Sequence, residues 1–296
     1  MRNVDDLIEK ALSRRNFMVG AGTAAALTAA GCNRHFYPQP GPAPNPNPTL
    51  TDEDYLNFAL NLEYLEASYY LIASTGSGLS AADMGSGGGP VTGGSKVPFT
   101  SSVQQEYAYE IAQDELNHVR FLRSALGSAA VPMPAIDLVN SFNTAAMAAG
   151  IGSSFNPFAS FNSFLIGAFV FEDVGVTAYS GAAPLLTNKT YLSAAAGIQA
   201  VEAYHAGEIR TLILRSGFTN IGYANQISAL RAKLGGGNET TLSATTVVAC
   251  DPTNAIAFSR TPQQVLNIVY ASPDGNLTYG GFFPSGLNGN IKSTEA

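Results

Sequence analysis

The motifs Glu115-Leu116-Asn117-His118 and Glu202-Ala203-Tyr204-His205 are the stretches that decide the fold of this chain. Each places a glutamate three residues before a histidine, and the chain has only three histidines. Three residues along an α-helix bring two side chains to one face, where they can bind the same ion. Chance would produce two such pairs about once in 200 chains of this composition. The motifs therefore predict two helices that contribute ligands to a metal site.

Four long helical segments carry or accompany these motifs. Capping residues and apolar spacing predict helices over residues 51–76, 101–126, 156–181 and 189–215, the third beginning at Asn156-Pro157. The glycine-rich residues 76–100 are expected to be a flexible loop without a regular element. Residues 128–156 form a long connection with a short helix near 137–148, as is typical of a segment that crosses a fold. Four helices with one long crossover favour an all-α four-helix bundle.

The other two helices each offer a single glutamate, Glu63 in the first and Glu172 in the third. One glutamate from each of two helices and Glu-x-x-His from each of the other two is the ligand set of carboxylate-bridged dimetal sites in ferritin-like bundles. Four carboxylates facing a bundle core are costly to desolvate, whereas two divalent ions neutralise them. Oxygen and imidazole donors suit iron or manganese.

Three longer stretches resemble the ferritin-like domain family, and more narrowly its exported desiccation-related members. The resemblance covers about residues 51–287 and implies a ferritin-like four-helix bundle with a dinuclear iron or manganese centre. It further implies that Glu63 and Glu172 are single carboxylate ligands. The paired ligands that it implies are Glu115, His118, Glu202 and His205. The stretches are Asn61-Leu62-Glu63-Tyr64-Leu65-Glu66-Ala67, Phe171-Glu172-Asp173-Val174-Gly175-Val176-Thr177-Ala178-Tyr179 and Val201-Glu202-Ala203-Tyr204-His205-Ala206-Gly207.

Several carboxylates near these positions keep more than one interpretation. Glu66 lies about 60° round the helix from Glu63, so it is either an acceptor behind the ligands or an exposed side chain. Asp173 is an alternative to its neighbour Glu172 as a ligand. Asp114 is expected on the solvent-facing side of the second helix.

Tyrosines also occur on the predicted helices. Tyr70 follows Glu63 by seven residues, and the resemblance associates this spacing with ferritins. Aromatic residues on bundle helices more often serve packing, so Tyr70, Tyr179 and Tyr204 are expected to pack, with a redox role as the less favoured alternative.

The first residues resemble a twin-arginine export signal. Ser13-Arg14-Arg15-Asn16-Phe17-Met18 precedes a weakly apolar run from Val19 to Ala30, which is too short to anchor the chain across a bilayer. Residues 1–31 are therefore predicted to be a signal peptide. The protein is expected to be exported to the periplasm or cell envelope.

Residues 32–50 are predicted to be a proline-rich tether, because alternating prolines hold an extended conformation. Cys32, at its start, resembles the lipidated cysteine of a bacterial lipoprotein, which would tether the protein to a membrane. Cleavage near Ala30 without lipidation is an equal alternative. A disulfide between Cys32 and Cys250 is a third.

The length, net charge and apolar content of the chain limit its domain organisation and the kinds of partner it can bind. The 296 residues carry a net charge of −7, and the only adjacent basic pair is Arg14-Arg15, which argues against nucleic acid as a partner. Residues 51–218 are assigned to the bundle. Residues 219–296 are assigned to a partly irregular C-terminal extension that packs on it, since no stretch there has enough apolar residues for its own core. The oligomeric state is left open.

Two functions from different classes fit the predicted centre. The first is an oxidative enzyme, an oxidase or a catalase-like protein, whose metal pair reacts with O₂ or peroxide. The second is a non-catalytic metal-binding protein that protects against stress such as desiccation, in which the site stabilises the fold. Iron storage in a cage is the least favoured function, because the glycine-rich loop and the tether do not suit a closed shell.

Overall fold

A computed structural model describes residues 50–272 and 276–294 of the chain. The structure is mostly helical and its long helices pack as a bundle, so the predicted fold class is confirmed. The predicted signal peptide, the tether up to residue 49 and Cys32 with its three alternatives lie outside the described residues.

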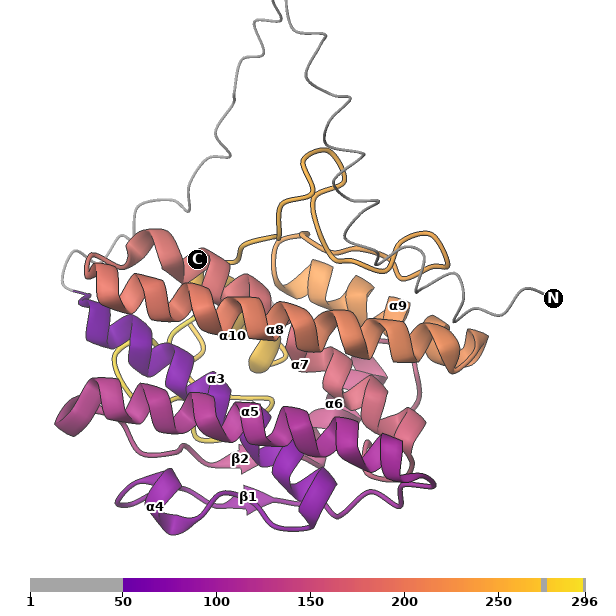
Figure 1. The fold of residues 1–296 in the computed structure, drawn as a ribbon, viewed down its shortest axis with the longest axis horizontal. Helices are drawn as coiled ribbons and strands as arrows, with labels where there is room; N and C mark the ends of the chain where they lie inside the picture. The colour runs from indigo at the N-terminus through magenta and orange to yellow at the C-terminus, as the bar shows by residue number, and fades with distance from the viewer. Residues whose placement is uncertain (1–49, 273–275, 295–296) are drawn as a thin grey trace, which may run out of the picture. The chain divides into compact units, whose positions relative to one another are not determined.

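The bundle consists of two helix pairs. Helix α3 (Asp52–Thr75) packs along α5 (Ser102–Leu126), and α7 (Phe161–Ala182) packs along α8 (Lys189–Arg215) (Figure 1). The α3–α5 pair is antiparallel, because the Val97 amide, just before α5, donates to the Ala73 carbonyl near the end of α3. The hydroxyl of Tyr69 joins the pairs by donating to the Phe164 carbonyl of α7 at 2.8 Å.

The two central helices differ from the two flanking ones in burial. Helix α3 is buried along its length from Tyr55 to Ser74, and α7 is buried over almost all of its residues. Helices α5 and α8 bury only one face each, and that face carries the Glu-x-x-His motif. The amphipathic spacing of α5 and α8 therefore directs both motifs to the interior.

Polar caps set the helix boundaries. The Thr51 amide donates to the Asp54 carboxylate at 2.7 Å at the start of α3, and the Asn188 side chain accepts from amides of the first turn of α8. The predicted start of the third helix at Asn156-Pro157 is wrong. Asn156 instead accepts from the Phe158 amide in a separate turn, and Ser160 caps α7.

The glycine-rich segment 76–100 is more regular than the sequence indicates. It contains the short helix α4 (Ala81–Met84) and the strand β1 (Val91–Thr92), which pairs in parallel with β2 (Ile136–Asp137). A Cβ at Gly89 would lie 2.5 Å from the Ala135 amide nitrogen, so glycine is required for the two backbones to approach. The expectation of a loop without regular elements is therefore wrong.

The long crossover and the C-terminal part complete the fold. The crossover holds the one-turn helix η1 (Gly127–Ala129) and α6 (Asn140–Ala148), and η2 (Ala183–Leu185) joins α7 to α8. Helix α9 (Phe218–Leu234) opens the C-terminal extension, and α10 (Pro262–Val269) follows an irregular segment. Both α9 and α10 pack on α7.

A chain of buried ion pairs ties this C-terminal part to the bundle. Arg210 of α8 and Arg231 of α9 both contact Oδ2 of Asp173, at 2.8 and 2.7 Å. Glu239 then pairs with Arg231 at 2.8 Å and with Arg260 at 2.7 Å. Since breaking one such buried pair leaves a charge without compensation, the chain fixes α9 and the segment before α10 against α7. Asp173 thus serves as an arginine partner, and its alternative role as a ligand in place of Glu172 is excluded.

One helical stretch of the described residues, from Phe161 to Leu185, is long and apolar enough to cross a membrane by length and composition alone. In the structure 78% of its most apolar window is buried. Its hydropathy is therefore accounted for by its place in the core of the bundle.

Candidate metal centre

The six candidate ligands come from four helices and meet in the interior of the bundle. Each is buried, and the four carboxylates are at most 1% exposed. The structure thus brings together every site residue that the sequence singled out, namely Glu63 of α3, Glu115 and His118 of α5, Glu172 of α7, and Glu202 and His205 of α8.

These side chains form two groups that share one carboxylate. In each group the potential ligand atoms lie within 4.8 Å of one another. Glu115 belongs to both groups, so its two oxygens can serve two ions. One group is Glu63, Glu115, His118 and Glu202, and the other is Glu115, Glu172 and His205.

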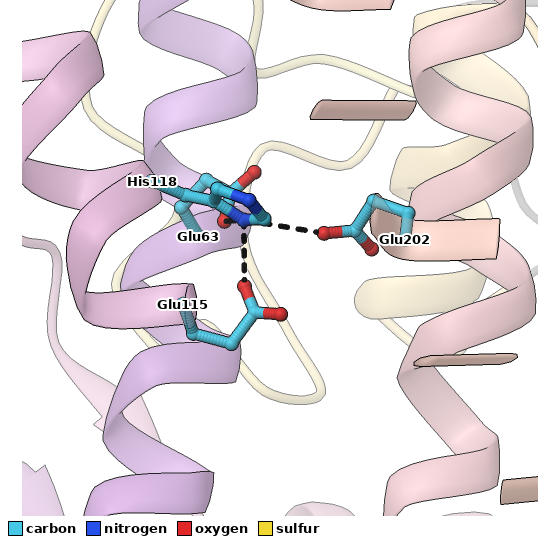
Figure 2. A group of neighbouring side chains, drawn as sticks. All are labelled: Glu63, Glu115, His118 and Glu202. Carbon is cyan, nitrogen blue, oxygen red and sulfur yellow. Dashed lines mark hydrogen bonds and ion pairs between the residues drawn. The ribbon is translucent and has the colours of Figure 1, made fainter. Parts of the chain in front are cut away.

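The first group surrounds Nδ1 of His118. This nitrogen lies 3.2 Å from Oε2 of Glu63, 3.3 Å from Oε2 of Glu115 and 3.5 Å from Oε1 of Glu202. Figure 2 shows the His118 ring with the three carboxylates directed toward it, Glu202 from the opposite side of the bundle. One ring nitrogen and three carboxylates from three helices therefore converge on one point.

The second group surrounds Nδ1 of His205. This nitrogen lies 2.9 Å from Oε1 of Glu115 and 3.7 Å from Oε2 of Glu172. The other ring nitrogen, Nε2, lies 3.2 Å from Oδ2 of Asp114, a residue expected on the solvent-facing side of α5. A proton on Nε2 donated to Asp114 leaves the lone pair of Nδ1 directed at the site, which is the usual way a carboxylate orients a histidine ligand.

Two tyrosines support the single glutamates in a reciprocal arrangement. The hydroxyl of Tyr70 donates to Oε1 of Glu172, and the hydroxyl of Tyr179 donates to Oε1 of Glu63. Each tyrosine follows by seven residues the glutamate of its own helix and bonds the glutamate of the other helix. Burial raises the pKa of both hydroxyls well above the ordinary value, so both stay protonated donors.

The polar atoms at the centre fit a metal pair. Buried side-chain atoms are normally hydrogen-bonded, and an atom without a partner costs free energy. Of the nine buried side-chain atoms without hydrogen-bond partners in the described part of the chain, five belong to candidate ligands: Oε1 of Glu115, Oε2 of Glu172, both oxygens of Glu202 and Nδ1 of His205. All are atoms that bind divalent iron or manganese. Two such ions would also compensate the four carboxylate charges.

Without metal, protons must provide that compensation. Burial, opposed by the charge of His118, raises the pKa of Glu63 to about 8. Burial also raises the pKa of Glu172 and of Glu202 above the usual range. Glu115 is the exception, because its contacts with both histidines outweigh burial and hold its pKa well below that range. The metal-free centre is therefore protonated on several carboxyl groups at neutral pH.

A glycine makes room for one ligand. A Cβ at Gly175 of α7 would lie 2.2 Å from Oε2 of Glu202 and 3.4 Å from Oε1 of Glu66. The Glu202 carboxylate can therefore reach the centre only because α7 has no side chain at this position. Glu66 is itself buried beside the centre, which excludes the interpretation that it is exposed.

Comparison with known proteins agrees with this geometry. The family model described as ferritin-like domain matches residues 51–215, more than half of the chain. The chain belongs to the ferritin-like domain family. This ferritin-like chain is 28% identical to the ferritin-like catalase Nec2 of Nesocodon mauritianus over 81% of its own length and 84% of that protein. It is 31% identical to the desiccation-related protein PCC13-62 of Craterostigma plantagineum over 73% of its length and 76% of that protein.

Tyr70 and Tyr179 support this ferritin-like site by donating hydrogen bonds to Glu172 and Glu63, so the expectation that they serve only packing is wrong. Two further supporting residues escaped the sequence interpretation. Asp114 and Gly175 gave no signal of their own, because their roles depend on contacts with another helix. Tyr204, by contrast, is 74% exposed and takes no part in the site.

We predict that Gly175→Ala lowers the metal content of the purified protein below two ions per chain, because the added methyl group collides with the Glu202 carboxylate. Metal analysis after loading and dialysis measures this. Gly197→Ala in α8 is the matched control, since nothing lies within 4 Å of its added Cβ. The control should keep two ions and gain about 0.5–1 kcal/mol of helix stability. Two tightly bound ions in Gly175→Ala would contradict the assigned place of Glu202.

We also predict that metal stabilises the protein more at pH 8 than at pH 5.5. Raised pKa values, such as that of Glu63 at about 8 against 4.5 for a free side chain, mean that the folded metal-free state holds protons which the unfolded state releases. The stability of the metal-free chain therefore falls as pH rises between these values. Although burial opposes it, the charge of Glu172 raises the pKa of His205 to about 11, which acts in the same direction from pH 6.5 upward. The lowered pKa of Glu115 has no effect in this range, because its carboxyl group is ionised in both states above about pH 4.5.

Bound divalent ions replace these protons, so the loaded chain should lose most of this pH dependence. Thermal unfolding with and without Mn²⁺ at the two pH values measures the difference in Tm. Glu63→Gln, which removes one of the titrating groups, should reduce the pH dependence of the metal-free chain. An equal Tm increase on metal addition at both pH values would refute the prediction.

Proposed function

We propose that this chain binds two iron or manganese ions between α3, α5, α7 and α8 and uses them to convert two molecules of hydrogen peroxide into two of water and one of O₂. The observation that carries the proposal is the shared carboxylate Glu115, whose two oxygens face His118 and His205 respectively. A carboxylate in this position suits two ions that act as a pair.

The candidate ligands divide naturally between the two ions. Glu63 and His118 would hold one ion, Glu172 and His205 the other, with Glu115 between them and Glu202 adjacent to the first. Bound iron or manganese supplies the electron exchange, since one peroxide must be oxidised to O₂ while another is reduced to water. The protein supplies the positions of the ligands and holds the protons that the two half-reactions exchange.

The surroundings of the site favour a small substrate. The ligand side chains are nearly inaccessible to solvent, and His118 and His205 are themselves buried. The two tyrosine hydroxyls fix the single glutamates by hydrogen bonds rather than leaving them free to bind a larger molecule. A neutral molecule of two heavy atoms suits this enclosure better than an organic substrate.

The comparisons give independent support to a peroxide reaction. The relative from Nesocodon mauritianus is named a ferritin-like catalase, and the alignment spans most of both chains. The relative from Craterostigma plantagineum is named a desiccation-related protein, which favours the second candidate function, a metal-binding protein that protects against stress without turnover. Both functions require the same metal centre, so only turnover distinguishes them.

We predict that the protein loaded with manganese or iron evolves O₂ from hydrogen peroxide faster than the same concentration of free ions. Glu115→Gln should lose most of this activity and at least one ion per chain, because it removes the carboxylate shared by both groups. Glu110→Gln, an exposed position on the same helix, is the matched control and should leave both unchanged. An oxygen electrode and metal analysis provide the two measurements.

The two measurements separate the candidate functions. Two bound ions with no O₂ above the free-ion rate would refute the catalase proposal and favour the protective protein. Absence of metal from native protein, together with failure to load it, would refute both.

We further propose that the protein is exported to the periplasm or cell envelope, with Cys32 as a candidate site of lipid attachment. The support is the sequence around Arg14 and Arg15 and the apolar run that follows. We predict that replacing both arginines by lysine retains the protein in the cytoplasmic fraction. The matched change Arg2→Lys should not. Equal export of both variants would contradict the assignment.

A further inference from the structure

A second feature of the interior lies beside the candidate metal centre. A small, partly open cavity of about 20 Å³ is lined by residues of α3, α7 and α10 and by Phe282. Its walls are apolar side chains such as Val174, Ile268 and Val269, and Glu66 is the one ionisable group among them. A space of this size holds a single water molecule or another molecule of one or two heavy atoms.

Glu66 connects this cavity to the centre. Its side chain is buried with 5% of the residue exposed, yet no hydrogen bond to the described residues is found for its carboxyl group. Gly175 lines the cavity as well, and a Cβ there would contact both Glu66 and the ligand Glu202. The carboxyl group of Glu66 therefore borders the cavity on the side where Gly175 adjoins the Glu202 carboxylate, and it can form a hydrogen bond to a molecule in the cavity.

The roof of the cavity comes from the C-terminal part of the chain. The Phe282 amide donates to the Val269 carbonyl at 2.9 Å, and the Phe282 ring packs on Phe171 with centroids 4.9 Å apart. A Cβ at Gly281 would lie 2.3 Å from the Val269 carbonyl oxygen, so the turn before Phe282 fits closely against the end of α10. These contacts hold the roof in a defined position over α3 and α7.

We propose that this cavity is the antechamber through which hydrogen peroxide reaches the metal pair, with Glu66 as the group that binds the peroxide by a hydrogen bond and with α10 and Phe282 as the roof. The inference rests on the proposed function for its substrate. It assigns the C-terminal part of the chain a role in the site, although none of the candidate ligands comes from it.

Access is tested without turnover by nitric oxide, a neutral diatomic that binds ferrous ions. The full-length chain is loaded with Fe²⁺ and the rate of nitric oxide binding is followed by stopped-flow absorbance. Ile268→Ala enlarges the cavity and should bind nitric oxide several-fold faster than the unmodified chain. Ile227→Ala, which removes an equally buried isoleucine of α9 outside the cavity lining, is the matched control and should not.

The width of the antechamber is tested with a larger peroxide. The unmodified chain should consume hydrogen peroxide but not cumene hydroperoxide, and Ile268→Ala should gain consumption of the latter while Ile227→Ala does not. Equal nitric oxide rates in the two variants, or cumene hydroperoxide consumption by the unmodified chain, would overturn the antechamber.

Glu66 is tested by a pair of variants. Glu66→Leu preserves volume but removes the polar group, and it should raise the KM for hydrogen peroxide about tenfold while kcat changes less, as expected for loss of one hydrogen bond. Glu66→Gln, which still forms hydrogen bonds, should restore a KM close to the original. Both should bind two ions, and a loss of metal in Glu66→Gln would overturn this role and identify Glu66 as a ligand.

Different measurements would refute the antechamber proposal and the proposed function. If the loaded chain evolves no O₂, the catalase proposal is refuted. The nitric oxide rates then still decide whether the cavity is the route by which small molecules reach the ions.

Discussion

The rest of the structure depends on the burial of four glutamates at the meeting point of four helices. Glu63, Glu115, Glu172 and Glu202 would each destabilise an apolar core if left charged and unpaired. The bundle therefore surrounds them with two histidines, two tyrosine donors and, in the metal-free state, bound protons. Several of their atoms still lack hydrogen-bond partners, which is consistent with a site for metal ions.

The two halves of the candidate centre carry equivalent residues at the same spacing. The positions at which the halves differ are informative. Each half has a glutamate followed seven residues later by a tyrosine, and a Glu-x-x-His motif on the partner helix. Two of the differences between equivalent positions involve a carboxyl group near the centre. Glu66 on α3 corresponds to Gly175 on α7, and Asp114 before Glu115 corresponds to Val201 before Glu202. Each difference places a carboxyl group beside one half of the centre only, so the two groups of candidate ligands are not chemically equivalent.

The sequence predicts best what depends on spacing within one helix. The Glu-x-x-His spacing and the helical spacing of apolar residues were sufficient for the fold class and for the extent of α8. Features that depend on contacts between distant segments were missed. The start of α7 depends on a turn made by the side chain of Asn156, and the pairing of β1 with β2 depends on the close approach of Gly89 to the crossover. Neither leaves a local pattern in the chain.

The buried ion pairs from Arg210 to Arg260 extend beyond the part of the chain that matches the ferritin-like domain. The match to the ferritin-like domain stops at residue 215 and includes all the candidate ligands. Asp173, however, directly follows the candidate ligand Glu172, and its partner Arg231 lies beyond that match. A protein truncated after α8 would keep its ligands but expose the back of α7 and leave Arg210 and Asp173 with only each other. The residues that match the ferritin-like domain and the residues that these ion pairs hold together are therefore different lengths of chain.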